Sequence, residues 1–386
     1  MRRVIRLLFT SLRWLSVVLV FSVAAEVFAC LDDKISWDAP FLSPYGNERL
    51  LDQDSLGFRG RANFRYQKWR MNNLGFRGPD IAPTPAPGVR RIAVIGASET
   101  FGLFESPGAE YPARMQVILD SIAPGRYEVI NVALPGLTLA SMVPYLQRAV
   151  VQTSASIVVI YPTPSFYLGP QPLPVEYIPP RYQPPALLHF AGWTLERAAL
   201  SSRLAGKGRE VMKQLIPPIL VTKVRESRLA ARRAEHDSSW VWRTVPADRM
   251  DAFRSSLNRL VASAKKEGLQ PLLVTHANRF SGAMQDTVGP DRRHIVNPMS
   301  LYYPQATPSI LIRTDSVANA IMCEVGAAQG VPVVEAERQI PASPAYFADF
   351  VHFTDVGADK MAHLVVRGIL SHAASPPPLA AAANHP

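Results

Sequence analysis

Cysteine is scarce in this sequence, with two residues among 386. So few cysteines exclude a fold stapled by disulfides and a zinc site built from clustered cysteines. No internal repeat and no heptad pattern is visible, which argues against a solenoid and a coiled coil. The phosphate-binding pattern GxxxxGK[ST] is also missing, so nothing indicates a P-loop nucleotide site.

Proline and positive charge, in contrast, are abundant. The chain has 35 prolines, and its 41 lysines and arginines outnumber 31 acidic residues to give a net charge of +10. Hydrophobic residues make up 48% of the chain, which is enough for a large core and excludes a mostly disordered protein. The prolines indicate long extended or loop segments. The charge raises nucleic acid or an anionic membrane as partners.

The first thirty residues have the pattern of an export signal. Four arginines precede and flank an apolar run at residues 15–25, and small residues follow at Ala29 and Cys30. A basic start, an apolar stretch of about 7–15 residues and a small residue at its end are typical of such signals. With the residues before it, the run reaches the ~20 residues that a spanning helix needs. We therefore predict that residues 1–30 are either a cleaved signal peptide or a retained membrane anchor.

Export decides which partners to expect. Positive charge before the apolar run would leave the rest of the chain outside the cytoplasm, either periplasmic or anchored to a bacterial inner membrane and facing outward. An exported chain rarely meets nucleic acid, so we expect no nucleic-acid partner. Membrane association through residues 1–30 and through a basic segment at 186–240 is the alternative that remains.

The rest of the chain divides by composition. Residues 31–88 are rich in loops and contain the similar pentapeptides LGFRG at 56–60 and 74–78. Residues 89–372 have the alternating pattern of an α/β domain, interrupted by an insertion at 162–247. The tail at 373–386 is rich in proline and alanine, and we expect it to be disordered.

Short runs of Val, Ile and Leu alternate with longer helical patterns in the α/β domain. Continuous apolar runs of this kind are typical of parallel strands buried on both faces, and alternation with helices predicts a doubly wound sheet. We predict five strands, at residues 91–96, 127–131, 157–161, 271–275 and 331–335. We predict helices at residues 110–121, 139–153, 247–267, 315–329 and 358–370.

The insertion has two parts. Residues 162–185 are rich in proline, which favours extended chain. Residues 186–240 are helical in pattern and strongly basic. They could form a solvated helical cap or an amphipathic lid that lies on an anionic membrane surface.

Candidate catalytic residues follow the ends of the predicted strands, where a doubly wound sheet places its site. Ser98 follows the first strand between small residues, and Gly136 follows the second. Asp349 and His352 precede the last helix and are spaced so that the carboxylate could orient the imidazole. Each feature alone is weak, because such a serine often only caps a helix.

Together these residues resemble the SGNH/GDSL-type hydrolases. The order of Ser98, Gly136 and the Asp349/His352 pair is similar to the blocks of that family, and Asn72 through Gly78 is similar to a stretch before the nucleophile in its exported bacterial members. The resemblance implies a flavodoxin-like three-layer α/β/α sandwich with no metal and no cofactor. It implies Ser98 as nucleophile, His352 as general base and then acid, and Asp349 as the orienting carboxylate.

The resemblance also implies an oxyanion hole formed by the backbone N–H groups of Ser98 and Gly136, and here the sequence departs from the family. The family places an oxyanion Asn after the third strand, whereas this chain has no Asn there. A lost donor costs about 2.7–4 kcal/mol in the barrier. Replacement donors could be the side chains of Thr163 or Ser165, or those of Asn278 or His276 after the fourth strand.

The expected function is an exported serine esterase that removes O-acyl groups, acetyl among them, from a carbohydrate. The same triad could transfer an acyl group to an envelope polysaccharide. A third alternative is a non-catalytic module that binds glycan or a secretion partner on a degenerate scaffold, which the missing Asn would favour.

Overall fold

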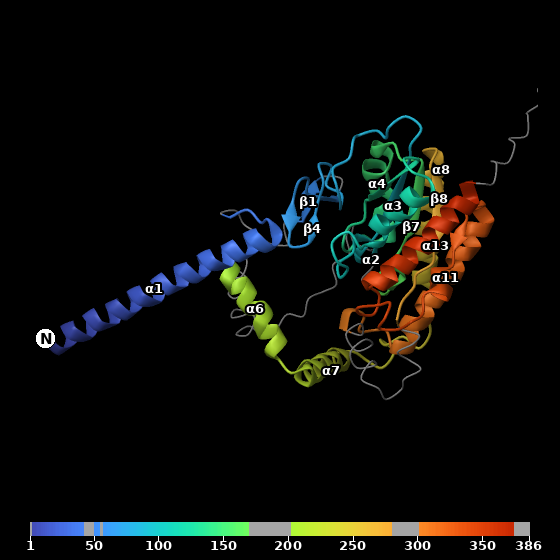
Figure 1. Ribbon diagram of the computed structural model, residues 1–386. Coiled ribbons are helices and arrows are strands. Elements are labelled where there is room, and N and C mark those ends of the chain that lie inside the picture. Colours follow the sequence, from blue (N-terminus) through green and yellow to red (C-terminus); the bar gives the residue numbers. More distant parts are fainter. Residues whose placement is uncertain (1, 42–49, 55–56, 170–201, 280–300, 374–386) are drawn as a thin grey trace, which may run out of the picture.

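The computed structural model describes residues 2–41, 50–54, 57–169, 202–279 and 301–373. At its centre is a five-stranded parallel sheet with the strand order β6-β5-β7-β8-β9 (Figure 1). The strands are β5 (Arg90–Gly96), β6 (Tyr127–Asn131), β7 (Ile157–Tyr161), β8 (Gln270–Val274) and β9 (Val333–Val334). This order is that of flavodoxin-like folds, so the predicted sheet is confirmed.

Helices cover both faces of the sheet, because alternate residues of each strand point to opposite sides. One face packs on α4 (Leu139–Ala149), α8 (Ala247–Lys266) and α11 (Pro308–Gln329), and the other on α3 (Tyr111–Ile122) and α13 (Asp355–Ala373). Within β5, Ala93 and Ile95 join the first core, while Ile92 and Val94 join the second. The three-layer α/β/α sandwich is thus confirmed.

Several boundaries differ from those predicted. Helix α11 begins at Pro308 rather than near 315, because the Thr307 hydroxyl accepts a hydrogen bond from the N–H of Ile310 (3.3 Å) and caps the helix there. Helix α4 ends at Ala149 and continues only as the 3-10 turn η2 (Val151–Thr153). The last strand is shorter than the predicted run at 331–335.

The N-terminal extension folds as two small hairpins. Strand β1 (Leu51–Asp54) pairs with β2 (Gly57–Gly60), and β3 (Arg65–Tyr66) pairs with β4 (Trp69–Arg70). The two LGFRG pentapeptides meet at Gly60 and Gly75, where a Cβ atom on Gly60 would lie 1.9 Å from the Gly75 carbonyl oxygen. The N–H of Arg77 donates to the Asn131 carbonyl (3.2 Å), which fixes the extension to the end of β6.

The insertion is partly described. It begins with the 3-10 turn η3 (Pro164–Leu168) and continues, after the undescribed residues 170–201, with α6 (Arg203–Leu215) and α7 (Pro218–Ala234). The helical pattern predicted within 186–240 is therefore confirmed for these two helices. Most of the proline-rich stretch, and the tail beyond Ala373, lie outside the described residues.

The chain starts with one long helix, α1 (Arg2–Trp37), which projects away from the sandwich (Figure 1). It runs past residue 30, where the predicted signal or anchor ends. Its part from Thr10 to Trp37 is long and apolar enough to cross a membrane, with a mean hydropathy of 2.2 in its most apolar stretch. An apolar helix at the N-terminus is compatible with a signal peptide or with an anchor.

Candidate active site

Ser98 stands at the carboxyl edge of the sheet, where β5 ends and the short helix α2 (Ser98–Phe101) begins. The turn between them requires glycine at position 96, because a Cβ atom there would lie 2.0 Å from the Thr100 hydroxyl oxygen. This tight turn leaves Ser98 partly exposed, whereas Ala97 and Glu99 on either side are buried.

Asp349 and His352 lie on the loop between α12 (Ala336–Gln339) and α13. One oxygen of Asp349 accepts hydrogen bonds from the backbone N–H groups of Val351 (3.0 Å) and His352 (2.9 Å). The other lies 2.7 Å from Nδ1 of His352. The loop closes against α13 at Gly357, where a Cβ atom would meet the Tyr346 carbonyl oxygen at 2.0 Å.

The loop brings His352 to Ser98, with 2.9 Å between Nε2 and Oγ. Burial by itself would lower the pKa of His352, but the hydrogen bond and charge of Asp349 outweigh it, and the pKa is raised. With its Nδ1 proton held by Asp349, the neutral imidazole turns the lone pair of Nε2 toward the Ser98 hydroxyl. This arrangement can take a proton from the hydroxyl and return it to a leaving group.

A second histidine, flanked by two carboxylates, is connected to Ser98 through Glu99. The Ser98 hydroxyl lies 3.2 Å from Oε2 of Glu99, whose other oxygen is 3.4 Å from Nε2 of His276. Nδ1 of His276 is 2.8 Å from Asp315, and the ring stacks on Tyr161. All three charged side chains are buried.

Opposite charges within this buried group stabilise one another. Burial would lower the pKa of His276, but the charge and hydrogen bond of Asp315, with those of Glu99, raise it to about 10. Burial would raise the pKa of Glu99, but the hydrogen bond and charge of His276 lower it to about 2. At neutral pH, His276 is therefore a cation between two carboxylates, and it has no access to substrate.

Sequence reasoning considered His276 only as an oxyanion donor and did not find its partners. The signal available was Glu99, an acidic residue next to the candidate nucleophile in a buried turn. Asp315 comes from α11 and gives no comparable signal, because only the packing of α11 on the sheet brings it to His276.

The other candidate oxyanion donors have partners of their own. The Thr163 hydroxyl donates to Glu99 (2.9 Å), and Tyr303 donates to the buried Ser165 hydroxyl (3.4 Å). The side-chain amide of Asn278 donates to Asp315. Gly136 lies in the loop after β6 with a φ of 84°, a conformation that favours glycine.

One wall of the site comes from a segment that the sequence did not single out. The ring of Phe104, 53% exposed, lies 5.0 Å from the His352 ring between centroids. The neighbouring Glu105 is buried, and burial raises its pKa to about 7. Lys68 of the N-terminal extension donates to the Glu105 carbonyl (2.6 Å), so the extension supports this wall.

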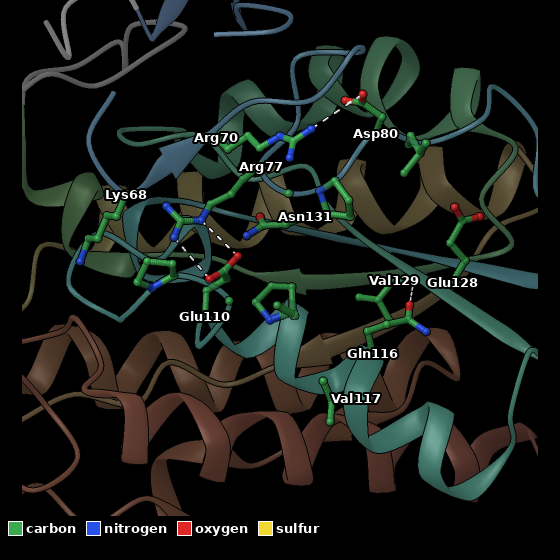
Figure 2. A pocket seen from close by; sticks show the side chains of 17 residues that line it. Lys68, Arg70, Arg77, Asp80, Glu110, Gln116, Val117, Glu128, Val129 and Asn131 are labelled. Carbon is green, nitrogen blue, oxygen red and sulfur yellow. Dashed lines mark hydrogen bonds and ion pairs between the residues drawn. The ribbon is translucent and has the colours of Figure 1, made fainter. Parts of the chain in front are cut away.

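A cavity of about 430 Å³ lies elsewhere, between the extension, α3 and β6 (Figure 2). Figure 2 shows Arg77 directed at Glu110, with 3.2 Å between Nε and Oε1, and Arg70 directed at Asp80. None of Ser98, Asp349 and His352 lines this cavity. Among the residues that the structure describes, no cluster of three or more His, Cys, Asp or Glu side chains could hold a metal ion.

Comparison with known proteins gives matches among solved structures. The chain is similar to GDSL-type lipases and acylhydrolases. A lipase/acylhydrolase from Enterococcus faecalis shares 17% identity over 74% of this chain and 97% of its own, with a TM-score of 0.41. A GDSL-like lipase from Bacteroides thetaiotaomicron shares 14% identity over 76% of this chain and 93% of its own, with a TM-score of 0.39. A catalytic mutant of an acetylxylan esterase from Geobacillus stearothermophilus shares 14% identity over 75% of this chain and 96% of its own, with a TM-score of 0.42. No protein-family model and no curated protein matches the sequence.

The buried His276 cation makes stability depend on pH. Its folded pKa, near 10, lies above the unfolded value of 6.5, so its contribution is complete below pH 6.5 and is lost as the pH rises toward 10. We expect His276→Gln to lower the free energy of unfolding by about 3–5 kcal/mol near pH 6.5, because two buried carboxylates lose their counter-charge. Urea unfolding at both ends of this window should show the difference shrinking as the pH rises.

The matched control is His363→Gln on α13, where the imidazole is half exposed. This variant should unfold like the parent protein at both pH values. A His276→Gln deficit that stays constant across the window would contradict the cationic assignment.

Proposed function

We propose that the protein is an exported serine hydrolase of the SGNH type that cleaves O-acyl esters through Ser98, His352 and Asp349. The observation that supports this most strongly is the chain of two short contacts, 2.9 Å from Ser98 to His352 and 2.7 Å from His352 to Asp349. A nucleophile, a base and an orienting carboxylate in hydrogen-bond reach of one another are the parts that acyl transfer through serine requires.

In the proposed reaction, Oγ of Ser98 attacks the ester carbonyl while Nε2 of His352 takes its proton. The tetrahedral intermediate collapses, the C–O bond to the alcohol breaks, and His352 gives the proton to the departing alkoxide. Water then attacks the acyl-serine while His352 takes its proton; the bond from the acyl carbon to Oγ breaks, His352 returns the proton to Oγ, and the carboxylic acid leaves. Asp349 keeps the Nδ1 proton in place and stabilises the imidazolium in both halves.

For the oxyanion hole we propose two backbone donors, the N–H groups of Ser98 and Gly136. Ser98 is the first residue of α2, where N–H groups lack partners within the helix. Thr163 and Asn278 are weaker candidates, because their side chains donate to Glu99 and Asp315. Ser165 is weaker because it is buried, although its hydroxyl only accepts from Tyr303. A hole with two donors would leave the barrier about 2.7–4 kcal/mol above that of one with three.

For the substrate we propose a short acyl group, with acetyl on a carbohydrate of the cell envelope as the leading candidate. Export would bring the chain to such carbohydrates, and the half-exposed ring of Phe104 offers an apolar face next to His352 against which a sugar could lie. Transfer of the acyl group to a second sugar would use the same acyl-serine.

The proposal predicts hydrolysis of p-nitrophenyl acetate and labelling of Ser98 by a fluorophosphonate probe. Ser98→Ala should abolish both, because Ser98 is the hydroxyl that His352 contacts among the described residues. Ser106→Ala is the control, since this exposed serine lies on the neighbouring loop and should not matter. Labelling without hydrolysis would indicate acyl transfer, and absence of labelling would indicate a non-catalytic binding module.

Asp349→Asn should lower kcat by about 10⁴, the loss known from serine proteases whose orienting aspartate is replaced. The asparagine amide would donate to Nδ1 and favour the tautomer with the proton on Nε2, so His352 could no longer accept from Ser98. Steady-state kinetics with p-nitrophenyl acetate measures the effect. A kcat within a few-fold of the parent value would show that Asp349 does not orient the base.

A further inference from the structure

The first turn of α6 is capped by an acidic residue of the N-terminal helix. One oxygen of the Glu26 carboxylate accepts the Ser202 hydroxyl (2.6 Å), and the carboxylate also accepts the backbone N–H groups of Arg203 (2.7 Å) and Leu204 (3.1 Å). Helix N-termini carry N–H groups without intrahelical partners and favour negative charge. Glu26 is therefore placed to hold the start of α6, although it lies in an otherwise apolar part of α1.

The next turns of the two helices are joined by ion pairs. Nζ of Lys207 lies 2.7 Å from a carboxylate oxygen of Asp32 and 2.7 Å from one of Asp33. Asp33 also faces Arg203, at 3.8 Å, and both of these side chains are largely buried. Cleavage at Ala29 or Cys30 would separate Glu26 from Asp32 and Asp33 and would leave Ser202, which accepts the Ala205 N–H (3.0 Å), as the remaining cap of α6.

Helix α6 is amphipathic, and its apolar face has no cover among the described residues. Leu204, Val211, Met212 and Leu215 follow the spacing of one helix face, and all four side chains are exposed. The exposed apolar residues continue through the turn into α7, and the whole series is 40–71% exposed. Its members are Leu204, Val211, Met212, Leu215, Ile216, Ile219, Leu220 and Val224.

Positive charge accompanies these apolar residues. Helices α6 and α7 together carry nine lysines and arginines but only two glutamates. An exposed apolar face with a strongly basic remainder is typical of helices that lie in the headgroup region of a membrane, with the apolar side about 5–10 Å deep. Anionic lipid headgroups are the partner that this charge fits.

The position of α6 on α1 places both helices at the same boundary. The stretch of α1 from Thr10 onward is apolar and hardly covered by the rest of the chain. Glu26 directly follows the apolar run at residues 15–25, where a spanning helix would meet the headgroups, and α6 leaves α1 sideways from this part (Figure 1). At the far end, Arg233 of α7 donates to the carbonyls of Pro304 (2.9 Å) and Ala306 (3.0 Å) in the sandwich.

We propose that α1 is retained as a membrane anchor and that Glu26 holds α6 at its outer end, so that the apolar face of α6 and α7 lies on an anionic phospholipid surface. This proposal rests on the part of the proposed function that has the chain exported, and not on its catalytic part. The anchor, the capped helix and Arg233 then fix the sandwich at a set distance from the lipid.

The first test is the mass of the full-length protein purified from bacterial membranes. The proposal predicts that residues 1–30 are present. A mature chain that begins after Ala29 or Cys30 would overturn it.

The second test uses an environment-sensitive NBD fluorophore on a single cysteine, in the full chain with Cys30 and Cys323 replaced by serine. Met212→Cys places the probe on the apolar face of α6, and Gln214→Cys places it about 100° around the helix axis from the middle of that face as the matched control. In nanodiscs that contain phosphatidylglycerol, we expect blue-shifted emission at 212, with several-fold stronger quenching by nitroxide-labelled lipid than at 214. Adding Glu26→Ala should reduce this difference.

Equal, water-like emission at the two positions would overturn the proposal, because it would show that lipid does not cover this face. A difference between 212 and 214 that Glu26→Ala leaves unchanged would overturn the role of Glu26. Esterase activity measured on the same nanodiscs should be similar in all variants, because these positions lie outside the site. A failure of membrane docking is therefore distinguishable from a failure of the catalytic proposal.

Discussion

The hydrogen bond between the Ser98 hydroxyl and the His352 imidazole is the interaction on which the proposed chemistry depends. It joins residues 254 positions apart in the sequence, and no local preference of either segment could produce it. The sheet makes it possible, because the turn after β5 and the loop before α13 both emerge at its carboxyl edge. Two glycines allow these segments to pack closely. Gly96 lies in the turn that leads to Ser98, and Gly357 lies where the loop of His352 packs on α13. At each position a Cβ atom would collide with its surroundings.

Two histidines lie near Ser98, one in direct contact with it and the other linked to it through Glu99. His352 is partly exposed and has one carboxylate partner, which suits the proton transfer that we propose for it. His276 is fully buried between two carboxylates and is held as a cation. That fixed cation offsets the negative charge of Glu99 next to the proposed nucleophile. A lone buried carboxylate there would repel a developing oxyanion.

Much of the sandwich could be predicted from sequence, because strands buried on both faces have continuous apolar sequences. The order of strands and helices followed from this pattern, whereas the start of α11 did not, since it depends on the cap at Thr307. Ser98, Asp349 and His352 were chosen by their places after predicted strands. The group of Glu99, His276 and Asp315 could not be predicted, because its members come from three separate segments of the chain and meet only through packing. The contact of Glu26 with the first turn of α6 could not be predicted for the same reason.

The most direct test of the central claim is to trap the acyl-enzyme. Protein mixed with p-nitrophenyl acetate and quenched in acid within the first turnovers can be digested and examined by mass spectrometry. The account predicts an acetyl adduct on the peptide that contains Ser98, and no such adduct in the His352→Ala variant. An adduct on another residue, or equal acetylation of Ser98 without His352, would contradict it.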